Sequence, residues 1–265
     1  MKKIYLIALS ILFIAPIFSQ EEEDSKSDTT RINIGNKEVI FIGHEEEGGE
    51  FSMENCDKRS EAHWAGLDFG FTMLMNDQFQ NQFDDHPYWN NDAARSQVWN
   101  LNILEHKFNI AKHYFGVTTG LGFSFTSVAF KNNYIISSTP DTLTAFIDTV
   151  NTFSKNKLKA AYLTVPLLLE FNTNRNAEKS FYLAAGVVGG VRLASKIKRK
   201  GEFDGNEFTK KESGRYGLNA FKVDGVVRLG YSHWGAFASY SLLPLFDDGK
   251  TVDAYPLTFG LSLNF

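Results

Sequence analysis

Six charged side chains fall on the polar face of segments in which apolar residues alternate with small or polar ones. They are Asp68, Glu170, Arg192, Lys222, Asp224 and Arg228. Charges that share a confined space are expected to pair, because an unpaired charge in a low-dielectric interior is strongly unfavourable. We therefore predict a buried ion-pair network centred on Glu170, Arg192, Asp224 and Arg228. A path for protons or ions is the alternative.

Hydrolysis of an acyl group is a second kind of chemistry to consider. It would need Ser96 and His86, which lie in or beside one predicted loop. A Ser–His pair is the minimum that an acyl-cleaving enzyme uses to activate a nucleophile. The spacing of these two residues matches no catalytic motif, and the sequence contains no HExxH, Gly-x-Ser-x-Gly or phosphate-binding loop. We expect no catalytic residues and no cofactor.

Two acidic groups, Asp84-Asp85-His86 and Asp247-Asp248, offer oxygen ligands of the kind that Ca²⁺ prefers. Carboxylates in loops are more often solvated than bound to a metal. We therefore expect no metal site.

The segments that position these residues are eight predicted β-strands. In the last of them, residues 255–265, one face of an extended chain carries only large apolar side chains, namely Leu257, Phe259, Leu261, Leu263 and Phe265. The other face carries Pro256, Thr258, Gly260, Ser262 and Asn264. The remaining predicted strands are 63–73, 97–109, 114–130, 158–171, 181–193, 218–231 and 235–246. The alternation degrades past Leu104, where we expect a β-bulge or the edge of a membrane.

The connections between these strands alternate in length. Long gaps (74–96, 131–157 and 194–217) follow the odd-numbered strands, short gaps (110–113, 172–180 and 232–234) follow the even-numbered ones, and a moderate gap (247–254) precedes the last strand. Tight turns at one end and long loops at the other are typical of barrels in the bacterial outer membrane. The sequence predicts an all-β fold, an eight-stranded antiparallel up-and-down transmembrane β-barrel over residues 63–265. A soluble, periplasmic calycin-like barrel that binds a small hydrophobe would have the two faces inverted, and alternation alone does not separate the two.

The N-terminal part is expected to lie outside the barrel. Lys2 and Lys3 precede an apolar run that ends near Ser19, which is typical of a cleaved signal peptide over residues 1–19. Residues 20–62 then form an acidic pre-barrel segment in the periplasm. Without Lys2 and Lys3, the 27 basic residues become 25 against 31 acidic ones, a net charge of −6, which argues against nucleic acid as a partner. The single cysteine, Cys56, excludes an internal disulfide.

Six runs of residues carry a resemblance to a known family. They are Asp28-Thr-Thr-Arg-Ile-Asn-Ile-Gly-Asn-Lys-Glu-Val39, His63-Trp-Ala-Gly66, Gly116-Val-Thr-Thr-Gly-Leu-Gly122, Leu163-Thr-Val-Pro-Leu-Leu-Leu169, Tyr240-Ser-Leu-Leu-Pro-Leu-Phe246 and Gly260-Leu-Ser-Leu-Asn-Phe265. The chain resembles the PorT-like outer-membrane β-barrel family of Bacteroidetes. The resemblance implies a barrel in the cell outer membrane. The family's named member belongs to a protein-secretion apparatus, whereas most relatives have no assigned role.

The terminal strand also resembles the assembly signal of outer-membrane barrels, carried here by Phe259, Leu261, Leu263 and Phe265. The resemblance implies the barrel-assembly machinery as a partner, beside outer-membrane lipid and lipopolysaccharide. Lys196, Lys198, Arg199 and Lys200 begin the third long loop, where they could hold lipopolysaccharide phosphates or be ordinary loop charges. Secretion-system or extracellular partners would be met by the loops 74–96 and 131–157.

The expected function is therefore a non-enzymatic outer-membrane barrel with a structural, adhesive or assembly and secretion-accessory role. One alternative is a lipid-modifying outer-membrane hydrolase that uses a pair such as Ser96 and His86. The other is the soluble barrel described above.

Overall fold

The computed structural model describes residues 28–34, 37–43, 50–55, 62–111, 114–131, 133–139, 142–174, 176–203 and 206–265. The predicted signal peptide and Cys56 lie outside the described residues. In the part of the chain that is described, no helix is long and apolar enough to cross a membrane.

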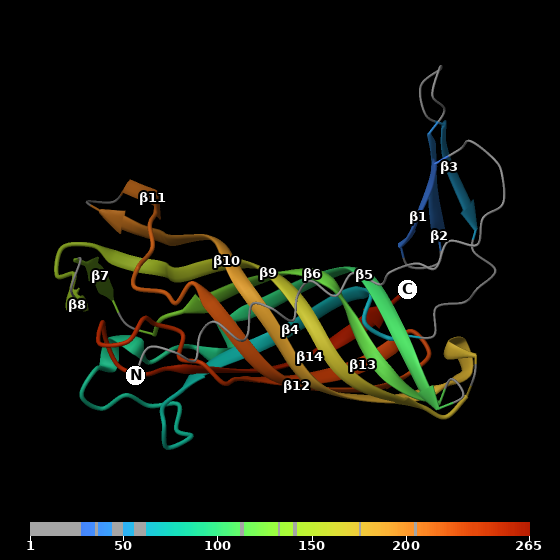
Figure 1. Ribbon diagram of the computed structural model, residues 1–265. Coiled ribbons are helices and arrows are strands. Elements are labelled where there is room, and N and C mark those ends of the chain that lie inside the picture. Colours follow the sequence, from blue (N-terminus) through green and yellow to red (C-terminus); the bar gives the residue numbers. More distant parts are fainter. Residues whose placement is uncertain are drawn as a thin grey trace, which may run out of the picture.

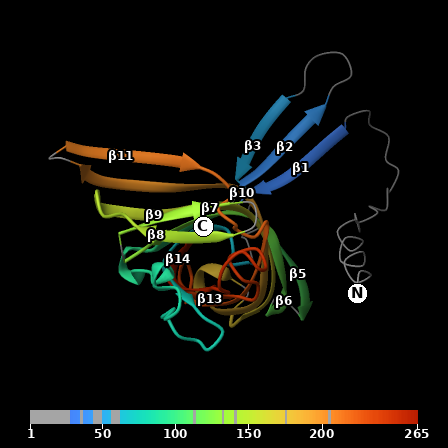
Figure 2. The same cartoon turned by 90° about the vertical axis from the view of Figure 1, so that its left-hand side faces the viewer.

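Eight antiparallel strands form a closed barrel (Figures 1 and 2). Each strand pairs with the next strand of the barrel along the chain, and the last pairs with the first, Leu263 opposite Leu67 and Tyr255 opposite Met75. The barrel strands are β4 (Gly66–Met75), β5 (Gln97–Ala111), β6 (Phe115–Ala129), β9 (Thr152–Asn172), β10 (Phe181–Phe203), β12 (Phe221–Tyr231), β13 (Trp234–Ser241) and β14 (Tyr255–Asn264). The predicted eight-stranded barrel is confirmed.

The two faces of the barrel wall differ as the alternation predicts. Large apolar side chains point outward and are well exposed, such as Leu261 at 65% and Leu167 at 58%. Polar and charged side chains such as Asp68 and Arg228, each 1% exposed, point into the lumen. An apolar outer face is stable only against lipid, so this arrangement is the one a transmembrane barrel requires and is the reverse of a soluble one.

The strand register shifts at four points in the described barrel wall, and two of these β-bulges, inside β5 and β10, change which residues face inward along most of the rest of the strand. In β5 the register shifts between Asn102 and Leu104, next to the position where the sequence predicts a bulge. In β10 it shifts between Arg192 and Ala194. Because side chains alternate along a strand, one extra residue moves every later side chain to the opposite face. Inward positions therefore change from even to odd numbers along both strands.

The two ends of the barrel are unequal. Tight connections, one of which contains the short 3₁₀ turn η4 (Ala177–Lys179), lie at the end where the C-terminus is found (Figure 1). A separate three-stranded antiparallel sheet stands at that end, formed by β1 (Asp28–Ile34), β2 (Lys37–Gly43) and β3 (Glu50–Asn55). The other end carries the long connections and, by the usual topology of such barrels, faces outward from the cell.

This outer end is more ordered than a set of loops. β10 continues well past the predicted end at residue 193 and forms a long hairpin with β11 (Asn206–Ser213), while β9 begins at Thr152 rather than at residue 158. The connection between β6 and β9 contains a second hairpin, β7 (Tyr134–Ser138) with β8 (Leu143–Ile147). The connection 76–96 contains two 3₁₀ turns, η2 (Pro87–Trp89) and η3 (Ala93–Arg95).

A hydrophobic core fills the outer end of the barrel. Its centre is Trp89, which is 0% exposed and lies with its ring 4.4 Å from that of Phe246 and 5.5 Å from that of Phe130. The Trp89 indole Nε1 donates a hydrogen bond to the Thr251 hydroxyl at 2.7 Å. The core also includes Leu74, Phe83, Val128, Ile136, Leu143, Leu158, Ile197 and Leu218. Side chains from the loops and from the inner face of the strands thus close the barrel on the outer side.

Candidate functional site in the barrel lumen

The centre of the lumen is occupied by a buried ion pair between β12 and β4. The Arg228 Nη1 and Nη2 atoms donate hydrogen bonds to the two carboxylate oxygens of Asp68, at 2.9 and 3.0 Å. Arg228 Nη2 also donates to Asn264 Oδ1 at 3.2 Å, and the side-chain amides of Asn100 and Asn102 donate to Asp68 Oδ2. A two-point guanidinium–carboxylate pair is the strongest geometry for such an interaction. Both charges are therefore compensated inside the barrel.

A second cluster surrounds Glu170 of β9, nearer the end with the tight turns. The Glu170 carboxylate lies 3.0 Å from His63 Nδ1, accepts a hydrogen bond from the Thr118 hydroxyl at 2.8 Å and lies 3.8 Å from Lys107 Nζ. The His63 ring stacks on that of Tyr182, with 4.1 Å between centroids. Glu170 thus has an imidazole, a lysine and a hydroxyl as partners, all enclosed.

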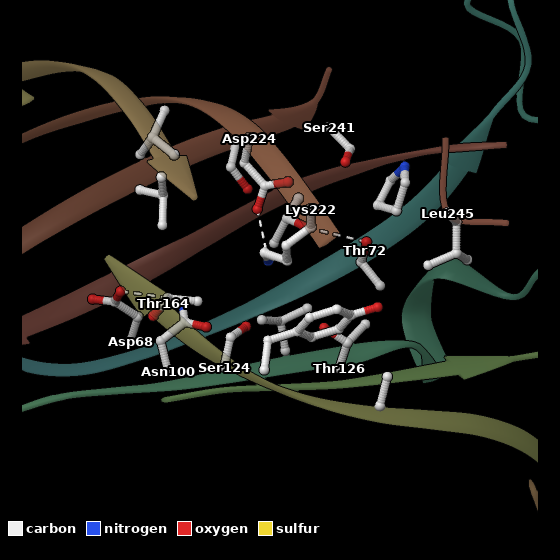
Figure 3. Close-up of a pocket in the computed structure, with 18 of the residues that line it drawn as sticks. Asp68, Thr72, Asn100, Ser124, Thr126, Thr164, Lys222, Asp224, Ser241 and Leu245 are labelled. Carbon is white, nitrogen blue, oxygen red and sulfur yellow. Dashed lines mark hydrogen bonds and ion pairs between the residues drawn. The ribbon is translucent and has the colours of Figure 1, made fainter. Parts of the chain in front are cut away.

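A third group lies higher in the lumen. Lys222 and Asp224 of β12 form an ion pair at 2.7 Å, and the Lys222 Nζ atom lies 5.2 Å from the centre of the Tyr162 ring (Figure 3). Arg192 of β10 donates instead to the backbone oxygens of Arg215 and Leu218.

The lumenal residues predicted from the sequence are thus present but arranged differently from the expected network. Among the described contacts, Glu170, Arg192, Asp224 and Arg228 pair with other residues rather than with one another. Arg228 and Asp224 pair with Asp68 and Lys222, which the prediction places on the inward face but not at the centre of the network. The other partners, His63, Lys107 and Asn264, lie outside the prediction. Asp68 was on the predicted inward face and could have been chosen. Lys107 was not, because the bulge in β5 changes the inward parity just before it.

A cavity lies between these charges and the hydrophobic core at the outer end. Figure 3 shows Asp68, Asn100, Ser124 and Thr164 around one part of it, and the Lys222–Asp224 pair and Leu245 around another. Trp64 Nε1, Asn100 Oδ1 and Asn102 Oδ1, from residues that line the cavity, have no hydrogen-bond partner within the described chain. Such groups favour bound water, so the cavity can hold water or a small polar molecule.

The residues considered for catalysis are not brought together. Ser96 is fully buried, where its Oγ donates to the Asp92 carbonyl at 2.7 Å and accepts from the Ala129 N–H at 2.8 Å. The His86 Nδ1 atom bonds with the Tyr88 hydroxyl at 2.8 Å. Ser96 therefore holds a loop against β6, and its hydrogen bonds do not include His86. No group of three or more His, Cys, Asp or Glu side chains that could hold a metal ion is found in the described ranges, which include Asp84, Asp85, Asp247 and Asp248.

The predicted assembly residues lie on the outer face of β14. Phe259, Leu261, Leu263 and Phe265 are all exposed there, and β14 is bonded to β13 on one side and to β4 on the other.

One family match agrees with this architecture. The comparison with curated proteins gives no match. Among solved structures, the chain is similar to Ail, the attachment invasion locus protein of Yersinia pestis, with 15% identity and a TM-score of 0.30 over 76% of this chain and 99% of that one. The model of the outer membrane protein β-barrel domain matches residues 58–247, which is well over half of the chain. With the closed barrel and its apolar outer face, this match shows that the chain belongs to the outer membrane protein β-barrel domain family and lies in the outer membrane.

Proposed function

We propose that this protein is a non-enzymatic outer-membrane barrel whose lumen is closed and whose outer end meets partners, in a structural, adhesive or assembly and secretion-accessory role. The observation that carries the proposal is the closure of the lumen at two levels. The Arg228–Asp68 pair crosses its centre, and the core around Trp89 fills its outer end.

A conducting barrel needs a continuous column of water. Arg228 and Asp68 are each 1% exposed, so they leave no such column beside them. Opening a path there would break a buried ion pair, which costs about 3–5 kcal/mol when one partner is lost. We expect the cavity above the pair to be a local water pocket rather than part of a channel.

The outer end offers the large surfaces that a narrow closed barrel otherwise lacks. The β10–β11 hairpin extends beyond the barrel wall, and the β7–β8 hairpin lies beside the mouth (Figure 2). Binding surfaces are commonly carried by connecting segments on a rigid scaffold. These two hairpins and the connection 76–96 are where we expect a partner to bind.

Single-channel recording in planar bilayers tests the closed lumen. We expect little conductance from the purified protein. Heat-dependent mobility on SDS gels, in which a folded barrel migrates differently before and after boiling, confirms that the inserted protein is folded. Large, steady conductance from folded protein would show that the lumen is open.

The hydrolase alternative is tested separately by mass spectrometry of lipid A from cells with and without the protein. The fully buried Ser96 and the engagement of His86 with Tyr88 support a non-enzymatic role. We expect identical lipid A in both strains. An acyl chain that is lost with the wild-type protein and restored by His86→Ala would make the protein an enzyme.

Three finer points of the proposal rest on the sequence. We propose that residues 1–19 are a signal peptide cleaved after Ser19 and that Phe259, Leu261, Leu263 and Phe265 are read by the barrel-assembly machinery. We also propose that any secretion-accessory role follows the PorT-like family that the chain resembles. Export of a Ser19→Pro variant, which should retain its signal peptide, checks the first point by mass.

A further inference from the structure

A continuous row of lysines covers one face of the barrel wall above the apolar belt. Strand pairing places Lys196 opposite Lys159, Lys198 opposite Lys157 and Lys200 opposite Lys155, and on the other side of β10 it places Lys211 opposite Lys198. We call these seven residues the lysine ladder: Lys155, Lys157, Lys159, Lys196, Lys198, Lys200 and Lys211.

The ladder faces outward because of the bulge in β10. Before Leu193, even-numbered residues such as Arg192 point inward, whereas after it Lys196, Lys198 and Lys200 point outward. The alternate residues of the same strands, Ile197 and Leu158, are buried at 1% and 3% in the core at the outer end. The seven lysines therefore share the face that lower down contacts lipid.

Like charges in directly opposite positions destabilise a sheet. Three consecutive Lys–Lys pairs are thus a cost that needs an external anion to offset it. Within the described residues, the carboxylate paired with the ladder is Glu207, which lies 2.8 Å from Lys200 at the outer tip. Glu212 is engaged on the other face of the hairpin by Lys210 and Arg199. Lys155, Lys159, Lys196, Lys198 and Lys211 have no carboxylate partner in the described chain.

The position of the ladder identifies the anion. Along β9 the outward side chains run from Val165 and Leu163 through Ala161 to Lys159, so contact with hydrocarbon gives way to cations within a few residues. At about 3.3 Å per residue, Lys159 lies roughly 13 Å along the strand from Leu163. Anionic headgroups lie directly above the acyl chains that contact a membrane protein.

We propose that the lysine ladder binds the phosphate groups of lipopolysaccharide in the outer leaflet, while the acyl chains of the same molecule lie against the apolar residues below. Ammonium groups bind phosphate as point charges, so the five ladder lysines without a carboxylate partner named above can hold several phosphates without a fixed geometry. The surface continues the lipid face without a break, which favours a lipid over a soluble polyanion. The proposal does not depend on the closed lumen.

The test uses native mass spectrometry to measure how much lipopolysaccharide the purified full-length protein binds in detergent. The wild type is compared with a ladder variant and with a control variant. The ladder variant carries Lys155→Gln, Lys159→Gln, Lys196→Gln and Lys198→Gln. A matched control carries the same change at four lysines outside the ladder: Lys131, Lys179, Lys210 and Lys250. We expect affinity to fall at least about tenfold in the ladder variant and little in the control, since each lysine near a membrane surface contributes appreciably to anionic lipid binding.

Two further arms separate the possible anions. Enzymatically dephosphorylated lipopolysaccharide should bind the wild type as weakly as intact lipopolysaccharide binds the ladder variant. Inorganic polyphosphate tests a soluble source: tight, ladder-dependent polyphosphate binding without a ladder effect on lipopolysaccharide would overturn the proposal. Equal lipopolysaccharide binding by wild type and ladder variant would also overturn it.

Weaker binding by the ladder variant would not be explained by misfolding. Removing like charges from opposite positions relieves repulsion, so the ladder variant should fold at least as well as the wild type. Heat-dependent mobility on SDS gels verifies this before binding is measured.

Discussion

Strands β9 and β10 pass through two regions of the molecule whose interiors have opposite chemistry. In the lower region the inner face carries Glu170 and lines a lumen of charges, while the outer face carries apolar residues such as Leu167. In the upper region the inner face carries Leu158 and Ile197 in a hydrophobic core, and the outer face carries lysines. The same strands therefore reverse their faces where the surroundings change from lipid to water. The reversal shows that the solvent, not the strand, decides which face is apolar.

The largest expected effect comes from breaking the polar interior. Asp68→Ala leaves Arg228 buried without its carboxylate and should cost about 3–5 kcal/mol of stability. Urea unfolding of the barrel in lipid vesicles, followed by loss of heat-dependent mobility on gels, measures the change. Asp224→Ala is the control, because the Lys222–Asp224 pair is less enclosed and should cost less. The double variant Asp68→Leu with Arg228→Met should recover most of the loss, since it leaves no charge unpaired. Unchanged stability of Asp68→Ala would show that the pair is not needed.

The matching test in the apolar interior is Trp89→Ala. It removes the ring contacts with Phe130 and Phe246 and the hydrogen bond to Thr251, and a buried Trp→Ala change typically costs about 3–5 kcal/mol. We expect this loss of stability to affect the outer end alone, because the barrel wall below it keeps its strand pairing. Limited proteolysis should then cut the connection 76–96 while the barrel still migrates as a folded species. Phe79→Ala, at an exposed site stacked on Tyr240, should cause little extra cleavage. A barrel that unfolds as a whole would mean that the two regions are one cooperative unit.

A third test places the same charged side chain on either face of β13, at two neighbouring positions. Ala238 faces the lipid beside Phe259, whereas Ser239 lines the lumenal cavity. An arginine on the lipid face costs about 2–4 kcal/mol near the middle of the bilayer. Ala238→Arg should therefore lower the yield of folded protein in membranes more than Ser239→Arg does. The two changes add the same side chain, so equal yields would contradict the assigned faces.

The smallest effect is expected in the turn after β8. Hydrogen bonds from the backbone N–H and side-chain amide of Asn151, and from the N–H of Val150, hold the pKa of Asp148 below its usual value. Because the folded pKa is the lower one, this stabilisation is present above the ordinary aspartate pKa of about 3.9 and is lost as the pH falls through the folded value. Nuclear magnetic resonance of the Asn151 side-chain amide should report a transition there. Asp148→Asn should abolish it, and a transition that survives this change would have another cause.

The sequence predicted the lower region well, because lipid outside and a narrow lumen inside impose strict alternation. All eight strands were expected from that pattern, and so were the inward positions of Asp68, Glu170 and Arg228. Their pairing was not, because which residues meet across the lumen depends on the stagger of strands far apart in sequence. Two bulges also changed the parity that the prediction relied on, and this is why Lys107 was missed.

The upper region was harder to predict for the opposite reason. Residues 152–157, 194–203 and 206–213 belong to strands, whereas the sequence predicts loops there because their outward face is charged rather than apolar. The core around Trp89 is assembled partly from connections with no period of their own, such as those that carry Phe83 and Phe246. Lys196, Lys198 and Lys200 were recognised as a basic cluster, but Lys155, Lys157 and Lys159 could join it only once the register of β9 against β10 was known.

The seam between β14 and β4 has a consequence for the order of events during biogenesis. The hydrogen bond from Thr258 to Thr72 across this seam joins residues 186 positions apart in the chain. Bringing such distant segments together carries a large loop-closure entropy, and contacts of this range slow folding. A nascent chain that lacks its last strand has two unpaired sheet edges and no way to satisfy their backbone groups in hydrocarbon. We therefore expect the wall to close last, when β14 pairs with β4, and only after β14 has been translated.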